Sequence, residues 1–279
     1  MIEWWQSVIL GIVEGITEFL PVSSTGHLTI TENLMGFSVN DPTVTAYTAI
    51  IQVGAMIASI VYFWKDIVRI ALAWFGGLVN PKKRSADYAM GWAVIFGFGI
   101  TAVIGLVLKD YIEGPLRSMW FVAGGLILWS VAMFLADRRT ATRGEDTIDA
   151  RDGILLGLFQ SLALIPGVSR SGATISGAMF LGIDRVAATR MSFFLGIPTL
   201  IAAGGLQAVG EFSKIGAPGG VGWTATGIGT LVSFVVAYLS IAWLLKFISS
   251  NNFTGFVIYR ILLGVTVAGL LLGGVLSAV

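Results

Sequence analysis

The 279-residue sequence contains no cysteine, a single histidine and few charged residues. Without cysteine, the chain can have no disulfide, no thiolate nucleophile and no cysteine-ligated metal site. A single histidine also argues against a histidine-rich zinc or di-metal centre. Charged residues make up 12% of the chain, against roughly 25% in soluble globular domains. The formal net charge of +1 argues against nucleic acid as a partner, because nucleic-acid binding requires a basic face.

Hydrophobic residues are abundant and make up 56% of the chain, with a mean hydropathy of +0.86. This composition predicts an all-α integral membrane protein. A bilayer core about 30 Å thick requires about 20 apolar residues per helix. Six segments meet that length, and we expect them to be transmembrane helices: 43–64, 86–108, 117–136, 186–210, 223–246 and 253–278.

Two further apolar segments, residues 6–20 and 153–165, are too short to cross the bilayer, and each ends at a proline. Each is followed by a loop rich in serine and glycine and then by a second short apolar piece. This pattern predicts two re-entrant helix–loop–helix hairpins, at 6–36 and 153–182. Irregular backbone of this kind is tolerated at membrane depth where protein or a water-filled cavity surrounds it.

The two hairpins resemble each other, which indicates an internal repeat. Residues 22–26 and 168–172 share the pattern V-S-x-[ST]-G at an offset of 146 residues, and three full spans follow each hairpin. Because three spans separate the copies, the second copy is expected to be inverted, as in many transporters. The predicted organisation is one membrane domain over 1–279, with repeat one at 1–136, a cytoplasmic linker at 137–151 and repeat two at 152–279.

Lysine and arginine are distributed unevenly between the two predicted faces of the membrane. Twelve fall on one face, and three, Lys109, Arg117 and Lys214, fall on the other. Cytoplasmic loops carry the excess of positive residues, so the face with twelve is expected to be cytoplasmic. The first hairpin would then enter the membrane from outside and the second from the cytoplasm, and their loops would meet near the midplane.

The motif EGITEFLPVSSTGH lies in the first hairpin and opens with two acids in an apolar setting. Glu14 and Glu18 are four residues apart, so their carboxylates project from one face of a helix. A solvated helix face would explain the pair without any function, but carboxylates at membrane depth are costly and usually line a cavity. We expect them to serve as a general base or as ligands of a hard cation such as Mg²⁺ or Ca²⁺.

Hydroxyl residues and the single histidine complete this motif. Ser23, Ser24 and Thr25 offer three hydroxyl groups, of which at least one is expected to cap the following helix. Gly26 permits close backbone approach, so that amide groups at the helix start can point at an anion. His27 follows directly, and its neighbours favour an acid–base role over a structural one.

The second hairpin, PGVSRSGAT, has Arg170 at the position that Ser24 holds in the first. An arginine in a loop at membrane depth needs an anionic partner, which is either a carboxylate of the first hairpin or a substrate phosphate. The acids are not duplicated in the second copy, and this asymmetry favours a catalytic site over a symmetric transport pathway. Arg260, near the start of the last span, is expected to snorkel to the cytoplasmic surface.

EGITEFLPVSSTGH and PGVSRSGATISG resemble the two signature motifs of the bacterial undecaprenyl-pyrophosphate phosphatase family, also called the bacitracin-resistance protein family. The resemblance covers essentially the whole chain. One departure is Arg190, where some members carry an acid. The resemblance implies hydrolysis of undecaprenyl diphosphate to the monophosphate carrier for cell-wall synthesis. It also implies a bacterial plasma-membrane location, and together with the charge bias we expect a site open to the periplasmic or outer face.

The resemblance implies functional roles for residues of both motifs. We expect Arg170 and the loop amides to clamp the diphosphate, and Ser24 to attack phosphorus with His27 as acid–base partner. Glu18 would orient the histidine, and Glu14 would complete the carboxylate face, with or without a divalent cation. The residues expected to bind substrate are Ser23, Thr25, Gly26, Ser169, Ser171, Gly172 and Thr174.

Several alternatives stay open at this point. Water could attack phosphorus directly while Ser24 only binds phosphate. A transporter or flippase of a phosphorylated lipid is the competing class of function, because inverted repeats with broken helices commonly build alternating access. The expected partners are the isoprenyl diphosphate and membrane lipid, and a homodimer is one oligomeric state to test.

Overall fold

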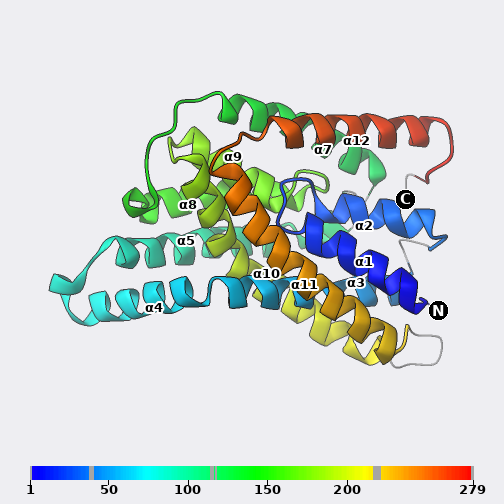
Figure 1. Cartoon of the computed structure of the whole chain (residues 1–279), viewed down its shortest axis with the longest axis horizontal. Helices are drawn as coiled ribbons and strands as arrows, with labels where there is room; N and C mark the ends of the chain where they lie inside the picture. The colour runs from blue at the N-terminus through cyan, green and yellow to red at the C-terminus, as the bar shows by residue number, and fades with distance from the viewer. Residues whose placement is uncertain (1, 38–40, 114–115, 117, 216–220, 278–279) are drawn as a thin grey trace.

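The computed structural model describes residues 2–37, 41–113, 116, 118–215 and 221–277, and these residues are almost entirely helical (Figure 1). The α-helices are, in chain order, α1 (Trp4–Thr17), α2 (Ser24–Leu34), α3 (Pro42–Tyr62), α4 (Trp64–Val79), α5 (Ala86–Val107), α6 (Lys109–Glu113), α7 (Met119–Asp137), α8 (Ala150–Ser161), α9 (Arg170–Phe180), α10 (Arg185–Ile215), α11 (Trp223–Ile248) and α12 (Thr254–Leu272). Short 3₁₀ turns occur at Pro81–Lys83, Glu145–Thr147 and Leu162–Leu164.

Six of these helices, α3, α5, α7, α10, α11 and α12, are long and apolar enough to cross a membrane. They confirm the six spans predicted from the sequence, and the chain is accordingly a multi-pass membrane protein. The largest differences are at C-terminal ends: α12 ends at Leu272, where the prediction ran to residue 278, and α10 ends at Ile215 rather than at residue 210. Arg117 and residue 278, the limits predicted for two of the spans, lie outside the described residues.

Two helices, α4 and the five-residue α6, were not predicted. α4 begins directly after Phe63, where α3 ends, and packs against α5, which it accompanies along the molecule in Figure 1. Charged residues in its first turns, among them Asp66 and Arg69, interrupt the apolar run and hide it from a span-length test. Asp66 and Arg69 form an ion pair at 3.0 Å, and Arg69 also pairs with Asp87 on α5.

The first helix of each predicted hairpin packs on a span from the other half of the chain. α1 lies against α11 and α8 lies against α5, and Figure 1 shows α1 beside α11. Glycines permit both crossings: a Cβ on Gly11 would lie 2.6 Å from the Gly229 carbonyl oxygen, and a Cβ on Gly157 would lie 2.5 Å from that of Gly97. Gly11 and Gly157 are 146 positions apart, so the two crossings use matching residues.

The turns that follow α1 and α8 have the same unusual backbone. The helices α1, α2, α8 and α9 contain 14, 11, 12 and 11 residues, too few to cross a bilayer at 1.5 Å per residue. α2 and α9 begin directly after Ser23 and Ser169, whose φ angles are 76° and 75°. A non-glycine residue in this region costs of order 1–3 kcal/mol and persists where surrounding structure holds it.

The segment between the two halves joins neighbouring helices through ion pairs. Arg190, the residue that departs from the family pattern, pairs with Asp66 at 3.0 Å and also with Glu145. Arg143 pairs with Asp152 at 2.6 Å, and these hydrogen bonds raise the pKa of the Arg143 guanidinium. Local pairing around the fourth span is therefore built on acids from α4 and the linker.

Candidate active site

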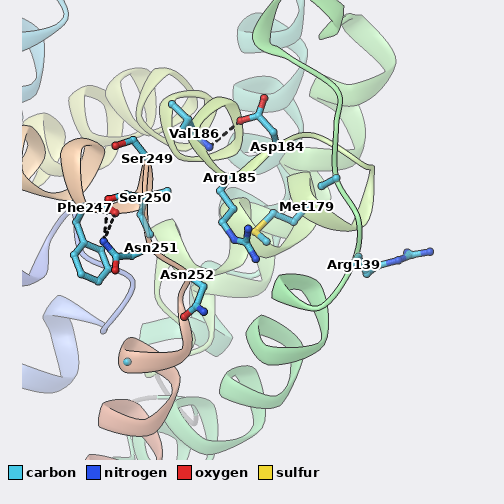
Figure 2. Close-up of a pocket in the computed structure, with 13 residues that line it drawn as sticks. Arg139, Met179, Asp184, Arg185, Val186, Phe247, Ser249, Ser250, Asn251 and Asn252 are labelled. Carbon is cyan, nitrogen blue, oxygen red and sulfur yellow. Dashed lines mark hydrogen bonds between the residues drawn. The ribbon is translucent and has the colours of Figure 1, made fainter.

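One surface cavity, of about 590 Å³, lies where α9, α10, α11 and α12 approach one another. Figure 2 shows the side chains of Asp184 and Asn251 hydrogen-bonded to neighbouring residues of the cavity. Arg185 binds Asp137 at 2.6 Å, Asp184 accepts from amides in the first turn of α10, and Asn251 donates to the Phe247 carbonyl at 2.9 Å. None of its lining residues belongs to either motif, so we place the candidate site elsewhere.

The two motifs meet at the carboxylate of Glu18, which is 7% exposed. Its Oε1 accepts a hydrogen bond from Arg170 Nη2 at 2.9 Å, and its Oε2 accepts one from Ser24 Oγ at 2.7 Å. Arg170 therefore has the anionic partner that its position required, and that partner is a carboxylate of the first hairpin. A cation, a hydroxyl group and a carboxylate thus converge from segments about 150 residues apart.

Helix geometry brings Ser24 and Arg170 to this point. They are the first residues of α2 and α9, where unpaired backbone amides favour anions. Arg170 Nη1 donates to the Gly196 carbonyl at 3.0 Å, while its buried Nε has no hydrogen-bond partner. The guanidinium therefore keeps an unused donor next to two helix N-termini.

His27 lies close by but bonds to other groups. Its Nδ1 is 2.7 Å from the Ser23 carbonyl oxygen, and its Nε2 is 2.6 Å from the Tyr259 hydroxyl. A carbonyl only accepts hydrogen bonds, so Nδ1 carries the proton, and in the neutral ring Nε2 accepts from Tyr259. The expected arrangement, with Glu18 orienting His27 toward Ser24, is therefore not the one in this structure, because Ser24 bonds to Glu18 directly.

Glu14 borders a second, smaller cavity of about 210 Å³ together with Ser24 and Thr25. It is 1% exposed, and neither of its carboxylate oxygens has a hydrogen-bond partner. Buried polar groups are nearly always paired, so this carboxylate is an exception that calls for a ligand or a proton. The remaining lining is also mainly polar and comprises Leu28, Thr29, Glu32, Thr45, Thr48, Ala49, Gln52 and Gln207.

The hydroxyl groups of the second motif hold its loop in place. Ser169 Oγ accepts from the Gly172 amide at 3.2 Å, and Thr174 donates to a backbone carbonyl of its own helix at 3.0 Å. Ser171 Oγ donates to the Leu20 carbonyl at 3.1 Å and so ties the second loop to the first. Their expected contacts with substrate stay a prediction.

In the first motif, Thr25 and Gly26 face different surroundings. Thr25 is exposed and borders the small cavity. Gly26 is buried, and a Cβ at this position would lie 3.1 Å from a methyl group of Val122 on α7. Its small size therefore lets α2 approach α7, and its expected role in substrate binding stays a prediction.

The sequence was compared with known proteins. A family profile described as "Bacitracin resistance protein BacA" matches residues 7–266. The chain belongs to the BacA family. The resemblance found in the two motifs is thereby confirmed.

Relatives of this BacA-family chain align along nearly its full length. A protein of Cutibacterium acnes named undecaprenyl-diphosphatase is 55% identical, with 99% of each chain covered. Undecaprenyl-diphosphatase 1 of Streptomyces avermitilis is 54% identical, with 98% of each covered. The Corynebacterium jeikeium protein of the same name is 46% identical, over 99% of this chain and 97% of the relative.

Three residues near the BacA motifs were misjudged or missed from sequence. Arg260 does not snorkel: it is fully buried and donates to the Pro21 and Gly167 carbonyls at 3.0 and 2.9 Å. The prediction was wrong because the hairpin loops bring acceptors to it that its place in the span does not reveal. Tyr259 was missed. The sequence offered one indication of it, which is that it stands next to Arg260 in an otherwise apolar segment. Glu32 was missed although it is an acid within the first hairpin.

Proposed function

We propose that this BacA-family protein is an integral membrane phosphatase that hydrolyses undecaprenyl diphosphate to undecaprenyl phosphate and inorganic phosphate. The observation that carries the proposal is the convergence of Arg170 and Ser24 on Glu18, at 2.9 and 2.7 Å. The relatives' shared name supports this substrate. The product is the lipid carrier for peptidoglycan synthesis, so the enzyme would recycle that carrier and confer bacitracin resistance.

In the proposed reaction, Ser24 Oγ attacks the terminal phosphorus and forms a phosphoserine. Glu18 Oε2, 2.7 Å from Oγ, accepts the hydroxyl proton as general base. The bond to the bridging oxygen breaks, and undecaprenyl phosphate leaves. Water then attacks the phosphoserine: Glu18 returns its proton to Ser24 Oγ as the phosphorus–Oγ bond breaks, and takes a proton from the attacking water. Phosphate departs, and Glu18 releases this last proton to solvent.

Charge neutralisation falls to Arg170 and to the amides at the two helix N-termini. Phosphoryl transfer depends mainly on positioning and electrostatic stabilisation, and these groups surround the nucleophile. His27 would exchange protons through Nε2 and Tyr259 rather than with Ser24. Direct attack by water is the alternative, and trapping phosphorus on Ser24 distinguishes the two. Label on Ser23 or Thr25, or on no residue, would rule out the Ser24 assignment.

We infer further that α1–α2 and α8–α9 are re-entrant hairpins of an inverted repeat. Support comes from the shortness of these helices, the matching positive φ angles of Ser23 and Ser169, and the matching glycine crossings. With the lysine and arginine bias, this topology would open the site to the periplasmic or outer face of the plasma membrane.

A single introduced cysteine tests that orientation, because the chain has none of its own. Thr25→Cys, at an exposed position beside the cavity, should react with a membrane-impermeant maleimide in intact cells. Ser250→Cys, also exposed, should react only after permeabilisation. The reverse pattern would contradict the orientation.

Glu14 and Glu32 are the residues we propose to hold a divalent cation such as Mg²⁺ or Ca²⁺. The sequence suggested Glu14 and Glu18, but both oxygens of Glu18 are bonded to Arg170 and Ser24. Glu14 is unpaired and shares its cavity with Glu32 and several hydroxyl and amide oxygens, which are the ligands that hard cations prefer. A bound cation would supply positive charge beside the diphosphate.

Calorimetric titration of Mg²⁺ and Ca²⁺ into purified protein tests this site without turnover. Glu14→Gln and Glu32→Gln should each weaken binding by at least tenfold, about 1.4 kcal/mol. Glu3→Gln, on the exposed end of α1, is the matched control. Unchanged binding in both cavity variants would contradict the proposal.

Phosphate release from undecaprenyl diphosphate by purified protein in detergent tests the enzyme itself. Wild type should release phosphate, and Ser24→Ala should reduce release to background. Wild type that releases none, but moves the lipid across vesicle membranes, would favour the transporter alternative. We retain the homodimer as a proposal, which light scattering in detergent tests.

A further inference from the structure

We propose that Arg260 is a positioning residue that clamps the two active-site loops together through their backbone carbonyl groups. The proposal rests on the proposed function, because it concerns how that site is assembled. Arg260 lies on α12, far in sequence from both motifs, and its side chain is fully buried.

The guanidinium of Arg260 donates to acceptors on three separate segments. Nη1 donates to the carbonyl of Pro21 at 3.0 Å, in the first loop. Nη2 donates to the carbonyls of Gly167 and Val168 at 2.9 and 3.0 Å, in the second loop. Nε donates to Ser130 Oγ on α7 at 3.1 Å. One side chain therefore holds both loops against the α7–α12 pair.

The two loops are held at corresponding positions. Pro21 and Gly167 are 146 residues apart, the offset that relates the two motifs, so the clamp binds the same carbonyl in each copy. Each carbonyl lies two residues before the serine with positive φ, Ser23 or Ser169. Such strained residues persist only where neighbouring structure fixes them, and Arg260 supplies that restraint on both sides at once.

Packing of the second loop against α7 fits the same arrangement. A Cβ on Gly125 of α7 would lie 2.9 Å from the Val168 amide nitrogen, so only glycine lets the loop lie this close. Nη2 of Arg260 also approaches the Gly125 carbonyl, at 3.3 Å. The second loop is thus confined between Gly125 on α7 and Arg260 on α12.

The charge of Arg260 also suits a site for an anion. All five of its acceptors are neutral, being four carbonyls and one hydroxyl group. Arginine remains protonated in proteins. Burying a charge at membrane depth is costly, so such a residue is expected to serve a function. Here an uncompensated positive charge lies behind the loops that lead to Ser24 and Arg170.

The test compares Arg260→Lys, Arg260→Met and a control, Arg185→Lys, all in purified full-length protein. Lysine keeps the charge, but a single ammonium group lacks the fork that reaches both loops. Arg185 binds Asp137, away from the loops, so its replacement makes the same arginine-to-lysine change at a position that does not hold them. Two quantities are measured: hydrogen–deuterium exchange of peptides covering 20–26 and 166–172, and kcat and KM for phosphate release.

We expect faster exchange in both loops of Arg260→Lys and a fall in kcat of about 10²-fold, the usual effect of displacing catalytic groups by about 1 Å. KM should change little in Arg260→Lys and rise in Arg260→Met, which loses the charge. Arg185→Lys should keep wild-type loop exchange and a kcat within about threefold of wild type.

Wild-type loop exchange in Arg260→Lys, or a kcat within threefold of wild type, would overturn the proposal. So would failure of both Arg260 variants to fold, because Arg260 would then be a general packing residue. If Arg260→Met alone fails to fold, Arg260→Lys decides. If wild type releases no phosphate, the proposed function fails, while loop exchange still reports whether the clamp exists.

Discussion

Replacing Glu18 by glutamine tests both of its proposed roles, because each carboxylate oxygen has one partner. Oε1 binds Arg170 and Oε2 binds Ser24. Glutamine keeps the size and one carbonyl acceptor but removes the negative charge. Ser24 then loses its general base, and Arg170, whose side chain is 17% exposed, loses its counter-ion.

The expected magnitudes follow from these two losses. General base catalysis contributes about 10²–10⁴-fold, so kcat should fall by at least about 10²-fold. Removing one partner of a buried ion pair costs about 3–5 kcal/mol. Arg170 keeps its bond to Gly196 and some exposure, so the stability cost should lie at the lower end, about 3 kcal/mol.

KM provides the sharper test. In the wild type, Glu18 competes with the diphosphate for Arg170, so removing the carboxylate should leave KM unchanged or lower it. Arg170→Gln removes the phosphate clamp and should raise KM. The two variants therefore affect kcat alike but move KM differently.

The assay is initial-rate phosphate release across a range of undecaprenyl diphosphate concentrations, with thermal unfolding measured on the same samples. Glu3→Gln controls for an acid-to-amide change elsewhere, at the residue before α1. A Glu18→Gln kcat within tenfold of wild type would refute the general-base role. A KM raised as much as in Arg170→Gln would refute the competition between carboxylate and phosphate.

Three further changes test the surroundings of the site. Tyr259→Phe removes the hydrogen bond to His27 Nε2, worth about 0.5–1.5 kcal/mol, so kcat should fall up to about tenfold; unchanged kinetics would exclude Tyr259 from the proton path. Gly167→Ala should lower the melting temperature, because φ is +88° and a Cβ would collide with the backbone of α7; Gly205→Ala, with open space around the Cβ, should not. Ser23→Gly relieves a positive φ of 76° and should stabilise the protein by up to about 1 kcal/mol; a lower melting temperature would show that the serine is not strained.

The spans could be predicted from sequence because one physical requirement dominates them. A helix that crosses about 30 Å of hydrocarbon must be long and apolar, and all six segments that meet this requirement are helices long and apolar enough to span a membrane. α4 was not predicted because Lys65, Asp66 and Arg69 break its apolar run. Its charged groups bond to α5 and the linker, which no property of α4 alone reveals.

The part of the site that lies within the two motifs could be predicted from sequence. The need of Arg170 for an anion was inferred from its apolar sequence setting, and Glu18 meets that need. The contacts of Tyr259 and Arg260 could not be predicted, since they join residues 232 and 239 positions apart. Periodicity and spacing report on neighbours along one element, whereas these contacts depend on how α12 meets both loops.

Comparison of matching positions in the two halves indicates why one of them carries the chemistry. Gln160 lies 146 residues after Glu14 and donates to the hydroxyl groups of Thr101 and Thr199 at 3.1 and 3.0 Å. Its amide nitrogen thus joins three helices, whereas its Oε1 has no hydrogen-bond partner. Glu14 has no such partners and borders a cavity instead. Since buried polar groups are costly unless paired, the side chain with neither oxygen bonded has the greater need of a partner from outside the protein. This criterion favours Glu14 over Gln160 as a member of the proposed site.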